Sequence, residues 1–271
     1  MAVPTPAVKS YGERLTTRAP LVAHQCRAPT TVPPRAASSR SIVVLRAMRT
    51  RARQIEEVLG HEMMSRLPHA VSQCLTEPIW WQDELVGVHV VRALCELDLP
   101  AESEGYERVD NVPSPTWDWG GHALVHQTSL VHSGVNLFGP VLIGPHCEIG
   151  PNASIFGPTV VEGRSYLGPS VEVRRCLLLA GAEISHMSFV GHSVIGRDVS
   201  LGAFFCSAVR NLKRGTVHVL RGRSLVDTGE RRLGCVIADG VETGVCTTVM
   251  PGRRVTEVTM TPPNALVEKN C

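Results

Sequence analysis

Residues 143–173 read IGPHCEIGPNASIFGPTVVEGRSYLGPSVEV, and an aliphatic residue returns at every sixth position of this stretch. The repeated residues are Ile143, Ile149, Ile155, Val161, Leu167 and Val173. A period of six belongs neither to an α-helix nor to a single strand. Short strands joined by turns can bring every sixth side chain inward, and three such units close a triangular coil of about 18 residues. The stretch therefore predicts a parallel β-helix of hexapeptide repeats.

The same period extends in both directions from this stretch. The further inward positions that it predicts are Val125, Val131, Leu137, Leu179, Ile184, Val190, Ile195 and Leu201, and, after a gap, Ile237, Thr243, Val249 and Val255. Glycine often follows the aliphatic residue, and we expect it to supply a turn geometry that a Cβ would resist. About six coils should stack through parallel ladders, roughly 4.8 Å apart.

Composition limits what the chain can be. It has 271 residues, of which 43% are hydrophobic but only 4% aromatic, so the core should be aliphatic. The net charge is +2, which implies neither a strongly acidic nor a strongly basic partner. The nine cysteines form no CxxC pair and predict reduced thiols rather than a disulfide framework. No apolar run approaches about 18 residues, so no membrane span is predicted.

The first 55 residues differ from the rest, because they hold ten basic residues and a single acid, Glu13, among many Ser, Thr, Pro and Ala. This composition is typical of an organelle transit peptide, and equally of a basic disordered tail. The compartment is therefore predicted as cytoplasmic, or as a plastid or mitochondrion if the segment is a transit peptide.

The pattern divides the chain into six segments. Residues 1–50 are expected to be disordered, and residues 51–110 to form a helical cap and linker, with amphipathic helices at 51–68 and 83–98 that cover an open end of the coils. Residues 99–120 are rich in Pro, Ser and acids and should belong to the linker. The remaining segments are coils at 111–206, an inserted basic loop at 207–234, final coils at 235–258 and a tail at 259–271.

Two later segments carry ordered motifs: AEISHMSFVGHSVIGRDVSLGA, beginning at residue 182, and VDTGERRLGCVIADGVETGVCTTVMPG, beginning at residue 226. Together they resemble the C-terminal half of the bifunctional N-acetylglucosamine-1-phosphate uridylyltransferase/glucosamine-1-phosphate N-acetyltransferase family. The likeness covers residues 125–255. No GxGTR motif of that family's nucleotidyl domain occurs in residues 1–120, so uridylyl transfer is not predicted.

The resemblance implies a left-handed β-helix that works as a homotrimer, with acetyl-CoA as co-substrate in a groove between subunits. It implies that His186, in SHMSFVG, is the general base for N-acetylation of an amino sugar phosphate such as glucosamine 1-phosphate. An ammonium cannot attack a thioester, and imidazole titrates near neutrality. The alternative for a lone histidine is an ordinary turn residue.

The resemblance also assigns binding residues. Glu172 and Arg174, in GPSVEVRR, stand where the family holds the sugar hydroxyls and the phosphate, although an outward ion pair would look the same. Ala203 would line the cofactor groove. The family's asparagine falls at Val209 or, with a two-residue insertion, at Asn211, which would then contact substrate. The basic loop carries Arg231 and Arg232, which could meet coenzyme A phosphates from a neighbouring subunit or simply be solvated.

Several positions depart from the family pattern. They are Phe156 for an arginine, Phe189 for a tyrosine, His192 for an acid, Ser200 for an asparagine, and Phe204 with Phe205 for Gly-Thr, which should crowd the groove. These departures favour a second hypothesis, a non-catalytic or substrate-diverged trimeric β-helix that acts as a partner or regulatory relative of a sugar nucleotidylyltransferase.

Neither a metal nor a nucleic acid is predicted. His126 and His132 occupy equivalent positions in consecutive hexads, which places them on different faces of the triangle, and His122 stands apart from both. The basic loop has no interleaved aromatic residues, so it does not match a nucleic-acid surface.

Overall fold

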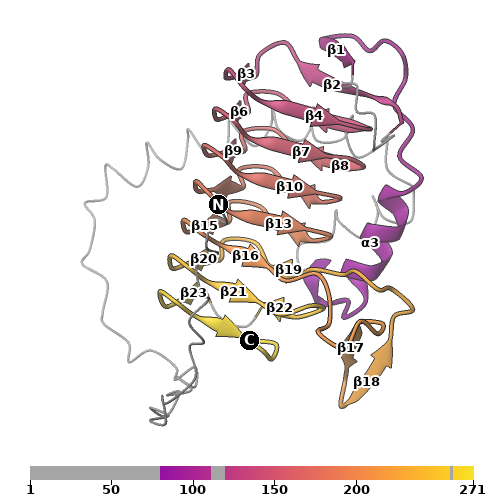
Figure 1. Ribbon diagram of the computed structural model, residues 1–271, viewed down its shortest axis with the longest axis vertical. Helices are drawn as coiled ribbons and strands as arrows, with labels where there is room; N and C mark the ends of the chain where they lie inside the picture. Colours follow the sequence, from indigo (N-terminus) through magenta and orange to yellow (C-terminus); the bar gives the residue numbers. More distant parts are fainter. Residues whose placement is uncertain (1–79, 111–119, 257–258) are drawn as a thin grey trace, which may run out of the picture. The chain divides into compact units, whose positions relative to one another are not determined.

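The computed structural model describes residues 80–110, 120–256 and 259–271. The predicted disorder at 1–50 and the predicted helix at 51–68 lie outside these residues. Within them the chain is mainly β, with one α-helix, α3 (Val86–Leu94), and a short 3-10 helix, η1 (Trp80–Gln82). Three sheets, which we name A, B and C, form a three-sided stack (Figure 1).

The strands of each sheet come from successive coils. Sheet A contains β1 (Tyr106–Asp110), β2 (His122–His126), β5 (Val141–Ile143), β8 (Thr159–Val161), β11 (Leu177–Leu178), β14 (Val194–Ile195), β19 (Val236–Ile237) and β22 (Arg254–Val255). Sheet B contains β3 (Leu130–Val131), β6 (Glu148–Ile149), β9 (Tyr166–Leu167), β12 (Glu183–Ile184), β15 (Ser200–Leu201), β20 (Glu242–Thr243) and β23 (Met260–Thr261). Sheet C contains β4 (Asn136–Phe138), β7 (Ser154–Phe156), β10 (Glu172–Arg174), β13 (Phe189–Gly191), β16 (Cys206–Ser207), β21 (Thr248–Val249) and β24 (Leu266–Val267).

The chain visits sheets A, B and C in turn, and successive coils pair in parallel. The turn from A to B is the first corner, the turn from B to C the second, and the turn from C back to A the third. This order confirms the predicted parallel β-helix. Sheets B and C have seven strands each, so there are seven coils where about six were expected.

The interior is aliphatic, as predicted: Ile143, Ile155 and Ile184 are fully buried in one cluster. One predicted position is wrong. Leu178, not Leu179, points inward, because Leu178 pairs with Val161. The third corner after β10 is one residue shorter than the third corner of the preceding coil, after β7. The inward position therefore comes five residues after Val173 instead of six. Leu179 instead joins the cluster outside sheet A.

The glycines act differently from the expectation. The positive-φ turn residue at the second corner is a non-glycine in most coils, for example Met187 with φ 55°. Gly168 follows the aliphatic residue because a Cβ there would lie 2.7 Å from the backbone nitrogen of His186, one coil away. Its role is therefore close approach between coils rather than an unusual turn.

Helix α3 corrects the prediction of an end cap. Its residues Val86, Val90 and Leu94 pack against outward-facing residues of sheet A, including Leu142 and Leu177, so the helix covers a side of the stack (Figure 1). The helix itself falls inside the predicted range 83–98. No helix in the described part of the chain is long and apolar enough to span a membrane.

Three predicted irregular segments contain strands. The predicted linker includes β1, which pairs antiparallel with β2, and the predicted tail includes β23 and β24, which complete a seventh coil. The inserted loop contains an antiparallel hairpin of β17 (His218–Arg221) and β18 (Ser224–Asp227).

The insertion is anchored to α3 by packing and by polar contacts. Val88 and Val91 of the helix pack against Val217, Val219 and Leu233. Arg92 Nε lies 2.9 Å from Glu230 Oε1, and Arg92 Nη2 donates to the Thr228 carbonyl at 2.6 Å. The helix and the insertion therefore form one layer over sheet A and its third corner.

Candidate active site

The predicted base, His186, lies at the second corner in the turn between β12 and β13. A backbone hydrogen bond joins this turn, Ser185–Ser188, to the turn of the next coil: the carbonyl of His186 accepts from the Phe204 N–H at 3.2 Å. The imidazole is exposed and forms no hydrogen bond with another described residue. It is therefore available to a molecule that approaches this corner from solvent.

The predicted cofactor residue Ala203 occupies the equivalent place one coil further along. Its carbonyl accepts from the Cys246 N–H at 2.8 Å, just as that of His186 accepts from Phe204. The structure thus brings the proposed base and the proposed groove residue together on successive coils of the same corner.

The two phenylalanines that follow Ala203 do not act alike. Phe205 is 1% exposed and fills the interior of the β-helix, so the prediction that both rings crowd the groove is wrong for Phe205. Phe204 is 49% exposed. Its ring meets the His186 ring edge to face, with centroids 5.9 Å apart and planes at 78°, and so forms one wall beside the imidazole.

Glu172 and Arg174 lie on β10, on the outer face of sheet C. The Arg174 Nη2 atom lies 3.0 Å from Glu172 Oε1, and the guanidinium carbon is 4.2 Å from the centroid of the Phe156 ring. Phe156 in turn stacks on Phe138 with centroids 4.7 Å apart. This layered stack orients the guanidinium and leaves both charged side chains partly exposed.

Asn211, Arg231 and Arg232 are not brought to His186 within one chain. All three lie in the insertion, which leaves the coils at the third corner. Asn211 Nδ2 donates to the Thr216 carbonyl at 2.7 Å and so closes a turn of the loop. Arg231 and Arg232 are exposed, so a molecule in solution can contact them, but at the third corner rather than beside His186.

Sequence reasoning noticed His192 only as a departure from a family pattern, and the structure gives it an unusual setting. It lies at the third corner, is 5% exposed, and its Nδ1 atom has no hydrogen-bond partner. Burial lowers the pKa of His192 to about 4, with further lowering by the charges of Arg175, Arg232 and Arg174. In the sequence, only the consecutive arginines 174 and 175 could have pointed to a basic cluster at this corner.

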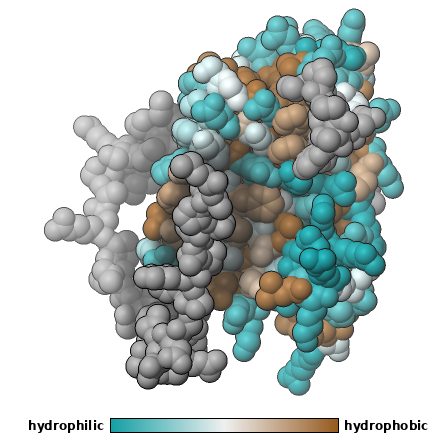
Figure 2. Space-filling view, viewed as in Figure 1, coloured by the Kyte–Doolittle hydropathy of each residue, from teal (hydrophilic) through white to brown (hydrophobic). Residues whose placement is uncertain are grey.

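An apolar ridge runs beside His186. It consists of the second-corner residues Met187, Phe204 and Val245, which are 58%, 49% and 48% exposed. Figure 2 shows hydrophobic side chains over the middle of the molecule and hydrophilic ones at its lower right, where the insertion lies. Exposed apolar side chains that gather in this way mark an interaction surface.

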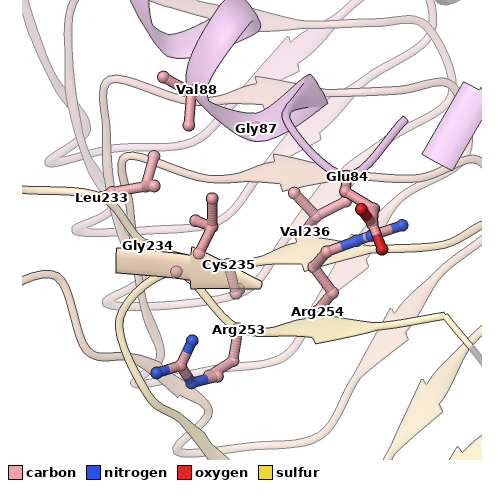
Figure 3. Close-up of a pocket in the computed structure, with 11 residues that line it drawn as sticks. Glu84, Gly87, Val88, Leu233, Gly234, Cys235, Val236, Arg253 and Arg254 are labelled. Atoms are coloured by element: carbon pink, nitrogen blue, oxygen red, sulfur yellow. The ribbon is translucent and has the colours of Figure 1, made fainter. Parts of the chain in front are cut away.

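A small hollow lies under α3, away from His186. Figure 3 shows Gly87 and Val88 of the helix over Leu233, Gly234 and Val236. A Cβ on Gly87 would lie 2.7 Å from Val236 Cγ2, so this is a packing joint. In the described part of the chain, no group of three or more His, Cys, Asp or Glu side chains could hold a metal.

The coil order, the repeated corners and the exposed histidine define a β-helix protein of hexapeptide repeats. Within that class, the chain belongs to the family of the GMPPB C-terminal domain, which matches residues 121–262.

Curated relatives match the same region. A bifunctional sugar-1-phosphate nucleotidylyltransferase/acetyltransferase from Sulfurisphaera tokodaii is 33% identical over 150 residues, which cover 55% of this chain and 37% of that protein. The bifunctional protein GlmU of Nitrosospira multiformis is 34% identical over 88 residues, 31% of this chain and 19% of that protein. The resemblance to the bifunctional family is thereby confirmed, although the chain spans less than two fifths of the length of these relatives.

Among solved structures, perosamine N-acetyltransferase from Caulobacter crescentus, crystallised with CoA and GDP-perosamine, is 16% identical. The match covers 53% of this chain and 51% of that chain, with a TM-score of 0.24.

Proposed function

We propose that this protein transfers the acetyl group of acetyl-CoA to the amine of a sugar phosphate or nucleotide sugar at the second corner, with His186 as general base. The observation that carries the proposal is that His186, whose imidazole is exposed, and Ala203, which is buried, occupy equivalent places on successive coils of one corner. A relative whose name includes acetyltransferase is 33% identical over 150 residues, and the matching family model covers both residues.

The reaction needs one proton acceptor at the amine. His186 takes a proton from the acceptor ammonium, and the freed electron pair of the nitrogen forms a bond to the thioester carbonyl carbon. The C–S bond then breaks with its electrons on sulfur, and the second nitrogen proton neutralises the departing thiolate. His186 finally returns its proton to solvent. Holding both substrates at the corner supplies much of the remaining rate advantage.

Glu172 and Arg174 suit the acceptor end of the site. They lie on sheet C, whose strands begin at the second corner, so an acceptor can reach from the imidazole along the sheet. The carboxylate can accept from sugar hydroxyls, and the guanidinium fork fits a phosphoryl group. Glucosamine 1-phosphate is the acceptor that we propose to test first.

A second copy of the chain docks on the apolar ridge in this proposal and completes the cofactor groove in a trimer. The exposed side chains of Met187, Phe204 and Val245 would be covered by that contact. Arg231 and Arg232 of the neighbouring copy would then face the phosphates of coenzyme A. Sedimentation equilibrium should give three times the monomer mass, and a monomer at micromolar concentration would contradict this part.

The test of the activity is an acetyl-transfer assay that measures free coenzyme A thiol. With acetyl-CoA and glucosamine 1-phosphate, thiol release should exceed the hydrolysis rate without an acceptor. A folded protein that releases no excess thiol with glucosamine 1-phosphate, glucosamine or a UDP-linked amino sugar would contradict the proposal. If calorimetry then showed no binding of coenzyme A, the non-catalytic alternative, motivated by the exposed Phe204 ring, would be favoured.

A further inference from the structure

At the third corner, basic residues of two segments that are far apart in sequence lie near His192. Arg174 is the last residue of β10 and Arg175 the first residue of the turn that follows. The His192 N–H of the next coil donates to the Arg174 carbonyl at 2.7 Å. The Gly234 N–H, two residues after Arg232, donates to the His192 carbonyl at 2.8 Å. The backbone therefore stacks Arg175, His192 and the end of the insertion directly above one another.

The imidazole of His192 is enclosed in this stack. It is 5% exposed, and its Nδ1 atom is buried without a hydrogen-bond partner. Buried polar atoms are satisfied in almost all native structures, so each exception needs a cause. A group that enters the corner could supply the missing partner.

The charges at this corner do not balance among the described residues. Glu172 pairs with Arg174, but neither Arg175 nor Arg232 forms an ion pair with any residue in the described ranges. The charges of Arg175, Arg232 and Arg174 all act on His192. Arg175 is partly exposed and Arg232 is exposed, so solvent-borne anions can reach both. The planar fork of arginine matches the geometry of a phosphoryl group.

We propose that Arg175 and Arg232, together with Arg174, form a binding site for a phosphoryl group at the third corner, with the His192 ring as its buried floor. The site itself rests on the backbone hydrogen bonds that stack these residues and on the unpartnered Nδ1 of His192, whereas the molecule that carries the phosphoryl group follows from the proposed function. Both the acceptor sugar phosphate and coenzyme A carry phosphoryl groups, and both can be tested separately.

The first experiment uses inorganic pyrophosphate as the probe and titrates it calorimetrically into the full chain. The double variant Arg175→Gln/Arg232→Gln should bind it at least tenfold more weakly. Arg175→Lys/Arg232→Lys should recover part of the affinity, because it restores charge but not the fork. The matched control is Arg164→Gln, which removes an arginine from the first corner of the same coil. Equal affinity in the wild-type protein and the double Gln variant would overturn the proposal.

The second experiment identifies the source of the phosphoryl group and uses the single variant Arg232→Gln, whose side chain is exposed, in case the double variant fails to fold. Glucosamine 1-phosphate is compared with glucosamine, and coenzyme A with its 3′-dephosphorylated form. A loss of affinity confined to the phosphorylated sugar assigns the site to the acceptor, and a loss confined to coenzyme A assigns it to the cofactor. No loss with either ligand contradicts the site. His186→Ala should keep the wild-type affinity for pyrophosphate, because His186 lies at the second corner and outside this site. A wild-type protein that binds pyrophosphate but transfers no acetyl group would refute the proposed function and not this site.

Discussion

The second corner of this β-helix keeps the same turn length in every coil, whereas the length of the third corner varies. The second corner repeats one four-residue turn. The same position of this turn has a positive φ in coil after coil, for example at Asn152, Ser170 and Met187. The third corner changes: it shortens by one residue after β10 and β13 and then admits the whole insertion. The repeated corner can therefore stack His186 and Ala203 in fixed register, while the variable corner gathers charges from distant parts of the chain.

The largest expected effect at the repeated corner is on catalysis. His186→Ala should lower kcat by about 10²–10⁴-fold with little change in KM, because it removes the proton acceptor and leaves the binding surface of the substrates in place. Steady-state measurement of thiol release checks this.

The matched control is His89→Ala, which removes a half-exposed imidazole from α3, where it lies 3.4 Å from Asp83. That variant should retain wild-type turnover. Equal kcat in His186→Ala and wild-type protein would refute the assignment of His186 as the base, and with it the claim that the second corner is the catalytic one.

A pair of glycine substitutions tests the structural side. Gly168→Ala should destabilise the protein by about 2 kcal/mol, because the new Cβ meets the backbone nitrogen of His186 at 2.7 Å and backbone cannot yield cheaply. Gly215→Ala, in the insertion, has nothing within 4 Å of its Cβ and should be neutral or stabilising by up to about 1 kcal/mol. Urea unfolding measures both, and similar losses for the two would show that the corners are not built differently.

The first corner supplies a smaller, pH-dependent effect. Glu162 is 5% exposed and accepts from the Ala180 N–H at 2.9 Å. Burial raises its pKa to about 7, partly offset by Arg197. The folded state therefore binds this proton more tightly than the unfolded state. The free energy of unfolding should fall as pH rises from about 4.5 through 7 and stay low above that.

Glu162→Gln removes this dependence, because the amide carries no charge and can still accept from Ala180. The variant should be more stable than wild type by about 1–2 kcal/mol at pH 8, with a smaller difference at pH 5. Thermal unfolding at both pH values checks this. Glu183→Gln, on the exposed face of sheet B, is the control, and a wild type that is equally stable at pH 5 and pH 8 would contradict the role of Glu162.

The sequence was sufficient to predict the coils because each repeat uses the same local geometry. Ile143, Ile155 and Ile184 could be placed inward from spacing alone. Leu178 could not, since two adjacent leucines satisfy the pattern equally and only the shorter third corner decides between them. The strands β23 and β24 were not predicted, although Thr261 and Val267 continue the inward positions of Thr243 and Val249 one coil further along.

The same limit applies to the site. His186 and Ala203 could be named because the family resemblance marks both, and the structure places them at one turn position, one coil apart. The basic corner could not, because Arg175 and Arg232 are separated by two coils' worth of chain and the insertion, and only folding stacks them around His192. The opposite fates of Phe204 and Phe205 likewise depend on which of two adjacent side chains the turn directs inward.

The central claim is that acetyl transfer takes place beside His186 at the repeated corner. A crystal structure grown with coenzyme A tests it most directly, because it needs no assumption about the acceptor. The account predicts that the thiol sulfur points toward the His186 ring, with Ala203 and Phe204 lining the pantetheine arm. Coenzyme A bound only at the third corner, or a thiol directed away from this imidazole in every subunit, would contradict it.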